Sequence, residues 1–218
     1  MSWEYGGAYR RLDMKGVIEL PNDSRVMVCD WIHSLPEFMK EADTLFIDPP
    51  WSKGNINCFY TKADMEAPDY DFLWFSSVLF QRIDEIAPRH IFIEMGTEFL
   101  SHYLDECRKR FEFVTSYTAT YYNRKDSRCH IIHATNDSAR RRYDELEEMN
   151  EEQIIEWICK HHPYDCIGDL CMGLGLVGKY AFLNGRKFVG TELNEKRLAV
   201  LVDAIRSWPD MKKFRLIK

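Results

Sequence analysis

The stretch Thr44-Leu-Phe-Ile-Asp-Pro-Pro-Trp51 decides how this chain folds and where its chemistry lies. Its apolar residues favour a short buried strand bounded by turn residues. Two consecutive prolines lack backbone N–H donors and disfavour helical backbone before them, so the strand must end at Asp48. Because ligands bind at the carboxyl ends of strands in open α/β sheets, Asp48 is a candidate site residue.

The residues after Asp48 also suit the recognition of a planar ring. Pro49 and Pro50 leave carbonyl acceptors without neighbouring N–H partners, and Trp51 presents a flat aromatic face. An acid, free carbonyls and an indole fit an amino-bearing ring such as a nucleobase. On these residues alone, a strand followed by a proline-rich loop, with Trp51 as a lid on the core, explains the pattern equally well.

Composition favours a single soluble α/β domain. A chain of 218 residues with 45% hydrophobic and 14% aromatic residues can bury one substantial core. We expect residues 1–24 to form an N-terminal arm and residues 25–218 to form the domain. The sequence has neither a membrane-length apolar run nor a signal peptide, which predicts a cytoplasmic protein without membrane association.

Cysteine usage and charge narrow the range of partners. The seven cysteines include no Cys-x-x-Cys pair, and the cluster from Cys159 to Cys171 matches no common zinc pattern. We therefore expect neither a disulfide framework nor a metal site. A net charge of −6 disfavours a broad nucleic-acid surface, since duplex binders carry a basic face. Any contact with nucleic acid would be local, or supplied by a partner or second subunit.

Hydrophobic periodicity predicts alternating strands and helices. The runs that end at Asp30 and Asp48 are joined by a short crossover, so we expect parallel neighbours with both acids at one edge. We expect an irregular stretch at residues 52–69, whose Phe59 and Tyr60 either cover a ligand or pack inward. Further strands are predicted at 90–95, 164–169, 186–192 and 213–217, an antiparallel pair at 111–122 and 128–134, and helices at 32–41, 71–87, 97–110, 137–149, 150–162 and 194–208.

A glycine turn follows the predicted strand at residues 164–169. In Asp169-Leu-Cys-Met-Gly-Leu-Gly175, two glycines let a ligand approach the backbone, and a helix begins directly after them. About twenty residues later, another strand ends at Glu192, in the position that usually holds ribose hydroxyls. The turn is neither a P-loop nor a complete dehydrogenase motif. Glycines needed only for packing are the alternative, although they leave Glu192 unexplained.

Together, these segments resemble the β group of the amino-methyltransferases that act on nucleobases and use S-adenosylmethionine. The matching segments are residues 48–51, 169–175 and 185–193, and the proline segment precedes the glycine turn, as in the permuted order of this group. The resemblance implies a Rossmann-like α/β methyltransferase fold, with a mostly parallel sheet, one antiparallel hairpin and helices on both faces. It also implies a catalytic half at about 25–134 and a cofactor-binding half at about 150–218.

The resemblance assigns roles to the residues at the strand ends. Asp48 and the Pro49 carbonyl would accept hydrogen bonds from the amino group of a flipped base, on which Trp51 would stack. These acceptors would favour a nitrogen with a localised lone pair, and Asp48 would offset its developing positive charge. The implied catalytic residues are Asp48, Pro49, Pro50 and Trp51, and the implied cofactor-binding residues are Asp30, Asp48, Asp169, Cys171, Met172, Gly173, Gly175 and Glu192.

Within the cofactor-binding set, Glu192 would hold the ribose hydroxyls, Asp169 would lie near the methionine amino group, and Asp30 would reach the adenine. The chain departs from the family in three places. Cys171 stands where the family usually has Phe, and the predicted helix at residues 150–162 lacks a preceding Lys-Pro. Only residues 135–150 stand where the β group usually has a target-recognition domain.

We therefore expect a methyltransferase that acts on adenine N6 in DNA, without a separate target-recognition domain and with low specificity or guidance by a partner. The tryptophan after the prolines favours adenine over N4-cytosine. The alternatives are an N4-cytosine, RNA or small-molecule amino-methyltransferase, or a catalytically inactive scaffold subunit that binds the cofactor. A nicotinamide dehydrogenase is disfavoured because this chain lacks the third glycine spacing of the dehydrogenase motif. That function would also leave Asp48 to Trp51 unexplained.

Overall fold

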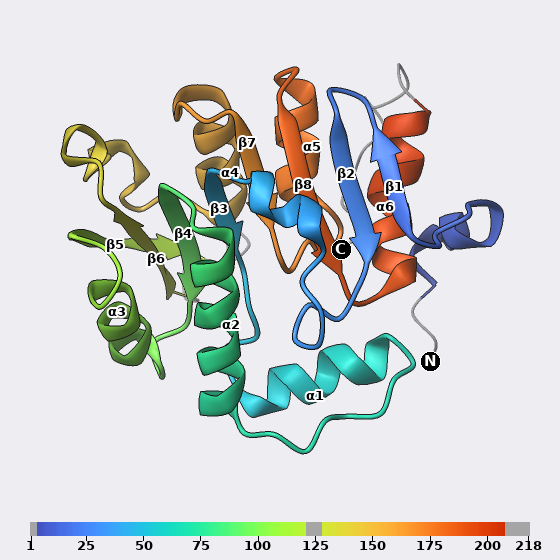
Figure 1. Ribbon diagram of the computed structural model, residues 1–218, viewed down its shortest axis with the longest axis horizontal. Coiled ribbons are helices and arrows are strands. Elements are labelled where there is room, and N and C mark those ends of the chain that lie inside the picture. The colour runs from blue at the N-terminus through green and yellow to red at the C-terminus, as the bar shows by residue number, and fades with distance from the viewer. Residues whose placement is uncertain (1–3, 121–127, 208–218) are drawn as a thin grey trace.

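The computed structural model describes residues 4–120 and 128–207, in which eight strands form one sheet (Figure 1). The strands β2, β8, β7, β3 and β4 run parallel, whereas β1 pairs antiparallel with β2, and β6 pairs antiparallel with both β4 and β5. The order along the sheet is β1 (Val17–Leu20), β2 (Ser24–Val28), β8 (Lys187–Glu192), β7 (Cys166–Asp169), β3 (Thr44–Ile47), β4 (His90–Met95), β6 (Arg128–Thr135) and β5 (Phe113–Thr120).

Helices cover both faces of the sheet, which confirms the predicted α/β class with a mostly parallel sheet. The central strands β3, β4 and β7 are buried along their whole length, as expected of parallel strands covered on both sides. Within the described ranges, none of the helices has the length and apolar character needed to cross a membrane. On one face lie α4 (Glu151–His161), α5 (Leu176–Leu183) and α6 (Glu195–Arg206), and on the other lie α2 (Phe72–Ile86) and α3 (Leu100–Arg108).

Side-chain caps explain where three of the predicted helices begin. Asn150 and Gln153 form a reciprocal capping box before α4. Asp71 and Asn194 each accept a hydrogen bond from a backbone N–H in the first turn of α2 and α6, respectively. The local sequence therefore determines these three starts, as predicted.

The prediction of an irregular stretch at residues 52–69 is wrong for its first half, which forms α1 (Lys53–Lys62). Ser52 caps this helix through its side chain. The sequence concealed the helix because its glycine and asparagines have low helical propensity, and only Ile56 and Tyr60 are buried. In Figure 1, α1 lies across the end of the sheet where the parallel strands finish.

The strands β2 and β3 bring Asp30 and Asp48 to the same edge of the sheet, as predicted. The prediction that these two strands are neighbours is wrong, because β8 and β7 lie between them. Packing explains why β7 fits beside β3. A Cβ on Gly168 would lie 2.7 Å from Leu45 Cδ2, so only glycine allows this approach. The chain connections reverse direction between β7 and β3, and such a switch point is where ligands usually bind.

Other segments also differ from the prediction or lie outside the described residues. Only the 3-10 helix η2 (Glu37–Glu41) forms within the predicted helix at 32–41. The predicted helix at 137–149 is reduced to the short turns η4 (Ser138–Arg140) and η5 (Asp144–Leu146), because most of its side chains are charged and exposed. Within the expected N-terminal arm, η1 (Tyr5–Arg11) and β1 are ordered elements. The predicted strand at 213–217 lies outside the described residues.

Three buried histidines pack together at the amino ends of the parallel strands, opposite Asp48. His90 Nδ1 lies 3.2 Å from His133 Nε2, and His162 Nδ1 lies 2.7 Å from the Tyr143 hydroxyl. Burial lowers the pKa of His90 to about 4, and it lowers the pKa values of His133 and His162 to about 3. The folded protein therefore keeps all three imidazoles neutral at neutral pH.

We expect acid to destabilise the fold through these histidines. Below pH 6.5 the unfolded chain binds protons at these positions while the folded protein does not, so the free energy of unfolding falls as the pH falls. Each histidine should contribute about 1.4 kcal/mol per pH unit between about pH 6 and 4. Urea unfolding followed by circular dichroism at several pH values measures the slope.

The variant His133→Gln, which cannot titrate, should have a slope smaller by one histidine's contribution. The matched control is His161→Gln at an exposed position of the same chain, which should keep the original slope. Equal slopes for the two variants would contradict the assignment to buried histidines.

Candidate active site

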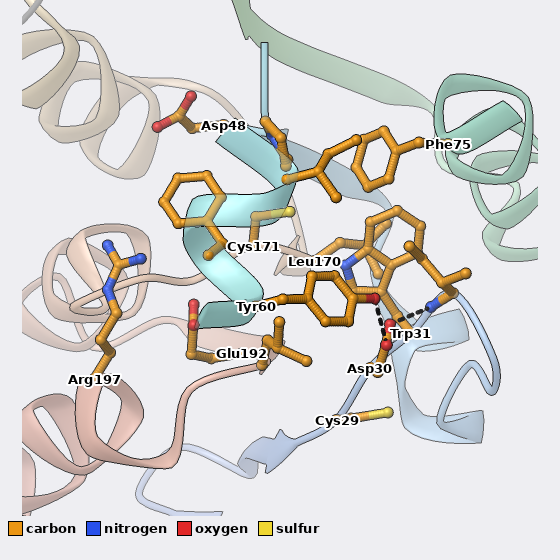
Figure 2. Close-up of a pocket in the computed structure, with 15 residues that line it drawn as sticks. Cys29, Asp30, Trp31, Asp48, Tyr60, Phe75, Leu170, Cys171, Glu192 and Arg197 are labelled. Atoms are coloured by element: carbon orange, nitrogen blue, oxygen red, sulfur yellow. Dashed lines mark hydrogen bonds between the residues drawn. The ribbon is translucent and has the colours of Figure 1, made fainter. Parts of the chain in front are cut away.

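Four acids predicted from the sequence meet at the carboxyl edge of the parallel strands. Asp30 follows β2, Glu192 ends β8, Asp169 ends β7, and Asp48 follows β3. Figure 2 shows three of these acids around one cavity. The register of the parallel strands therefore gathers carboxyl groups that are far apart in the sequence.

The larger of the two cavities described at this edge has a volume of ≈ 610 Å³, including its open mouth. Its walls are largely apolar, with Trp31, Ile32 and Leu170 among the lining residues, while Asp30 and Glu192 add carboxyl groups. An apolar slot with acids at its side suits a heteroaromatic ring joined to a hydroxylated sugar.

Helix α1 covers the larger cavity with Phe59 and Tyr60. The Tyr60 hydroxyl donates a hydrogen bond of 2.5 Å to Asp30 Oδ2. At the other end of the helix, Asn194 Nδ2 donates to the Lys62 carbonyl at 2.7 Å. The two aromatic residues therefore lie where they can cover a ligand, and Tyr60 is also buried.

The second cavity, of ≈ 510 Å³, lies at the switch point between β3 and β7. Asp169, Glu151 and Met172 line it. It shares Asp48, Cys171 and Arg197 with the larger cavity, so the two spaces meet at these residues.

The predicted glycine turn is held by the acids beside it. The Gly173 backbone N–H donates to Glu192 Oε2 at 2.5 Å, and Asp169 Oδ1 accepts from the Cys171 backbone N–H at 2.8 Å. Gly173 has φ +56° and Gly175 has φ +84°, a conformation that L side chains rarely adopt. The turn therefore needs both glycines for its backbone, and the Gly175 N–H closes it by donating to the Met172 carbonyl at 2.7 Å.

Trp51 holds Asp48 in place. Its Nε1–H donates to Asp48 Oδ1 at 3.0 Å, and its ring lies on Gly96, where a Cβ would be only 2.8 Å from Trp51 Cε3. The lining of the two cavities includes Pro50 but neither Trp51 nor the buried Pro49. In this structure the indole therefore orients the carboxylate from outside both cavities.

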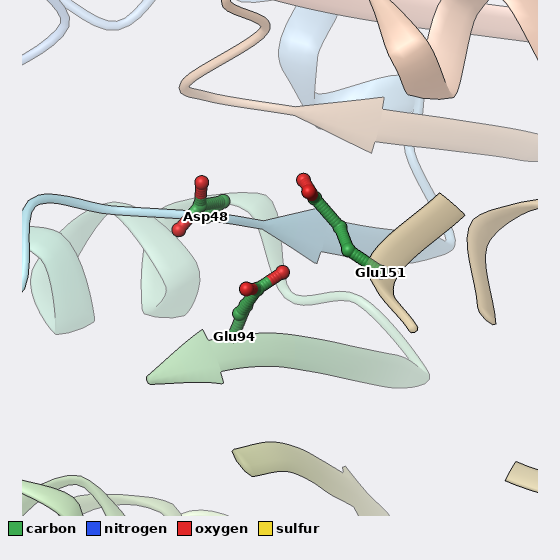
Figure 3. Close-up of side chains that lie close together, drawn as sticks. All are labelled: Asp48, Glu94 and Glu151. Atoms are coloured by element: carbon green, nitrogen blue, oxygen red, sulfur yellow. The ribbon is translucent and has the colours of Figure 1, made fainter. Parts of the chain in front are cut away.

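Sequence reasoning missed two acids that lie beside Asp48. Asp48, Glu94 and Glu151 each place a carboxylate oxygen within 4.8 Å of the others (Figure 3). The β3–β4 register pairs Ile47 with Ile93, which places the following residues, Asp48 and Glu94, side by side. Only the strand register reveals Glu94, because its own strand reads as an ordinary buried run. Three carboxylates at this spacing repel one another. A shared cation would relieve that repulsion, and so would protonation of the carboxyls.

Burial makes these carboxyls unusually weak acids. It raises the pKa of Asp48 to about 7, although the Trp51 hydrogen bond and the Arg197 charge act in the opposite direction. Burial, together with the negative charge of Asp48, raises the pKa of Glu151 to about 8 and that of Glu94 well above its usual range. Because the three carboxyls lie this close together, they lose their protons in steps that belong to the cluster as a whole.

Arg197 is a further residue that sequence reasoning missed. It lies in the first turn of α6 and lines both cavities. Burial raises the pKa values of Asp48, Glu151 and Glu192, and the positive charge of Arg197 partly offsets this effect. The first turn of an amphipathic helix gives no sequence signal for such a role, so Arg197 could be found only from the fold.

The same fold occurs in solved structures of low sequence identity. M1.HpyAVI in complex with SAM matches with a TM-score of 0.58 and 14% identity, over 82% of this chain and 97% of that chain. TTHA0409, a proposed DNA modification methylase from Thermus thermophilus complexed with S-adenosyl-L-methionine, matches with a TM-score of 0.59 and 14% identity, over 86% and 95%. PvuII DNA methyltransferase, which is cytosine-N4-specific, matches with a TM-score of 0.52 and 13% identity, over 85% and 89%.

These likenesses confirm the predicted Rossmann-like methyltransferase fold. No protein-family model and no curated protein matches the chain.

The variant Trp51→Phe should raise the pKa of Asp48. The indole N–H stabilises the carboxylate form, so its loss favours the protonated form by about one pKa unit. Carbon-detected NMR titration of labelled aspartate carboxyls measures this value. Trp74→Phe, at an exposed position of α2, serves as the control and should leave the titration unchanged. An unshifted Asp48 in Trp51→Phe would show that the indole does not control the carboxylate.

Proposed function

We propose that this chain is a methyltransferase that transfers a methyl group from S-adenosylmethionine to the exocyclic N6 amino group of adenine in DNA. The observation that carries this proposal is the position of Asp48. Its carboxyl lies where two cavities meet, one suited to a ring and a sugar and the other lined by opposite charges. An acid at such a junction can act on a group that enters beside a bound donor.

The residues present fit the proposed methyl donor. The larger cavity offers apolar walls for the adenine and Glu192 for the ribose hydroxyls, whereas Asp30 already accepts a hydrogen bond from Tyr60 at its edge. The methionine part would lie in the smaller cavity, beside Gly173, Asp169, Cys171 and Met172. Gly175 lines neither cavity and packs against Leu201. Bound S-adenosylmethionine would supply a methyl group that its positively charged sulfur has already activated.

Asp48 would prepare the target nitrogen for this methyl group. An exocyclic amino nitrogen is a weak nucleophile because its lone pair is delocalised into the ring. The Asp48 carboxylate and the Pro49 carbonyl would accept hydrogen bonds from the amino group and favour a localised lone pair. When the nitrogen gains the methyl group it becomes positively charged and loses a proton, which Asp48 can accept and return to solvent.

Trp51 would contribute first by orienting Asp48, as its hydrogen bond indicates. Stacking of Trp51 on a flipped base is also proposed, and it would require the indole to leave its packing against Gly96. The tryptophan after the prolines supports adenine as the target. An N4-cytosine amino group is the second candidate, because the fold is shared with a cytosine-N4-specific enzyme.

Charge and chain organisation support guidance by a partner or second subunit. The net charge is −6, and only residues 135–150 separate the proposed catalytic half at 25–134 from the cofactor-binding half at 150–218. We propose that this single domain lacks a separate target-recognition domain, so another chain would deliver the DNA. All seven cysteines are free thiols, which supports a reducing compartment such as the cytoplasm.

The variant Asp48→Asn should reduce methyl transfer by at least about 100-fold, because an amide carries no charge and accepts no proton. Its Kd for S-adenosylmethionine should stay within about twofold of the original, since Asp48 acts on the target nitrogen. The assay incubates the intact chain with labelled donor and separate DNA, RNA and nucleotide pools, followed by nucleoside mass spectrometry. The control is Asp105→Asn, at an exposed position of α3.

Three outcomes of this assay would change the proposal. Equal loss of transfer and donor binding in Asp48→Asn would give Asp48 a structural role. Methylated cytosine, or label in RNA or free nucleotides, would replace adenine in DNA as the target. Label in no pool, despite donor binding, would favour the inactive scaffold subunit.

The rate of methyl transfer should rise with pH between about pH 6 and 8. The pKa of Asp48 is about 7, and only its carboxylate form carries the negative charge and can take up a proton. A pH profile of kcat/KM, which reports the pKa values of the free protein, measures this dependence. A flat profile over this range would contradict the proposed role of Asp48.

A further inference from the structure

Arg197 occupies the junction of the two cavities and has no part in the function proposed so far. Figure 2 shows its side chain extending from α6 beside Glu192, toward the side of the site that holds Asp48. Its guanidinium lies over the glycine turn, because a Cβ on Gly173 would be 2.7 Å from Arg197 Nη2. A fixed positive charge therefore stands at the turn that opens the smaller cavity.

Glu151 faces the same smaller cavity from the first residue of α4. Its side chain is buried, and Figure 3 shows it directed toward Asp48 and Glu94. Asp169 lines this cavity as well, with one oxygen committed to the glycine turn. The smaller cavity thus combines a guanidinium from α6 with a carboxyl from α4.

A ligand group that carries both charges fits this arrangement. The planar guanidinium suits a carboxylate, which it can bind through two parallel hydrogen bonds, and a carboxylate suits an ammonium. The amino-acid end of the proposed methyl donor carries these two groups on one carbon atom. We propose that Arg197 binds the carboxylate and Glu151 binds the ammonium of this amino-acid end, an inference that rests on the proposed function.

The assignment makes a distinction between two related ligands. S-adenosylhomocysteine keeps the amino-acid end, whereas 5′-methylthioadenosine has the same adenosine and lacks that end. Contacts of Arg197 and Glu151 should therefore contribute to binding of the first ligand and not of the second. Binding of 5′-methylthioadenosine also reports whether a variant has kept its larger cavity intact.

Calorimetric titration of the intact chain tests this distinction. In Arg197→Gln, the Kd for S-adenosylhomocysteine should rise by at least about 30-fold, as expected when a charged partner is lost at a buried site. The Kd for 5′-methylthioadenosine should change by less than about twofold. Arg197→Lys, which keeps the charge but not the fork, should have an intermediate effect on S-adenosylhomocysteine. The control is Arg206→Gln, at an exposed position of the same helix.

Glu151 has a second signature, which is the release of a proton when the ligand binds. Burial and the charge of Asp48 raise the pKa of Glu151 to about 8, so it is mostly protonated in the free protein at pH 7. An ammonium beside it would favour the carboxylate, and calorimetry in two buffers of different ionisation enthalpy counts the proton. The charged and titratable groups that face Glu151 are Asp48 after β3, Glu94 on β4, Asp169 on β7, Arg197 on α6 and Glu152 on its own helix.

The variant Glu151→Gln should abolish this proton release and raise the Kd for S-adenosylhomocysteine by about tenfold. It should leave the Kd for 5′-methylthioadenosine unchanged. Glu156→Gln, at an exposed position of α4, is its control. Equal weakening of both ligands in Arg197→Gln or Glu151→Gln, or no weakening of either, would overturn this inference alone. Failure of the unaltered chain to bind S-adenosylmethionine and S-adenosylhomocysteine would overturn the proposed function, and this inference with it.

Discussion

The loss of hydration by several acids buried side by side is the constraint on which the carboxyl edge of this sheet depends. Parallel strands end together, so acids from distant parts of the sequence meet there and lose much of their hydration. The chain offsets this cost with hydrogen bonds from the glycine turn and from an indole N–H, and with the positive charge of Arg197. Where these groups are too few, the carboxyls keep their protons. The acids involved are Asp48, Glu94, Glu151, Asp169 and Glu192.

The glycine turn connects this electrostatic constraint to the shape of the site. Glu192 accepts backbone N–H bonds from Gly173 and Asn194, so one carboxylate fixes both the turn and the start of α6. Arg197 then projects from the first turn of α6 over the glycines. The same contacts that stabilise an acid thus position a cation, and the smaller cavity acquires charges of both signs without any contribution from a ligand.

Local sequence patterns were enough to predict the parts of the site that depend on neighbouring residues. The prolines after Asp48 end a strand, the capping box at Asn150 begins a helix, and the glycine turn precedes a strand that ends at Glu192. Other features depend on long-range packing and were not predictable. The strand order depends on the packing of β7 against β3. The position of Glu94 beside Asp48 follows only from the register of β3 and β4. Helix α1 forms despite its poor helical propensity because the sheet edge supplies its buried contacts.

The two ends of the sheet respond to pH in opposite ways. At the amino ends, the pKa values of the buried histidines lie below 6.5, so protons taken up by the unfolded chain favour unfolding as the pH falls. At the carboxyl ends, the pKa values of Asp48 and Glu151 are raised, so the folded state keeps protons that the unfolded chain has lost, and stability declines as the pH rises toward 8. Ionisation of Asp48 therefore lowers the free energy of unfolding of the domain. This is a trade-off between activity and stability built into one sheet, and a bound cation would relax it.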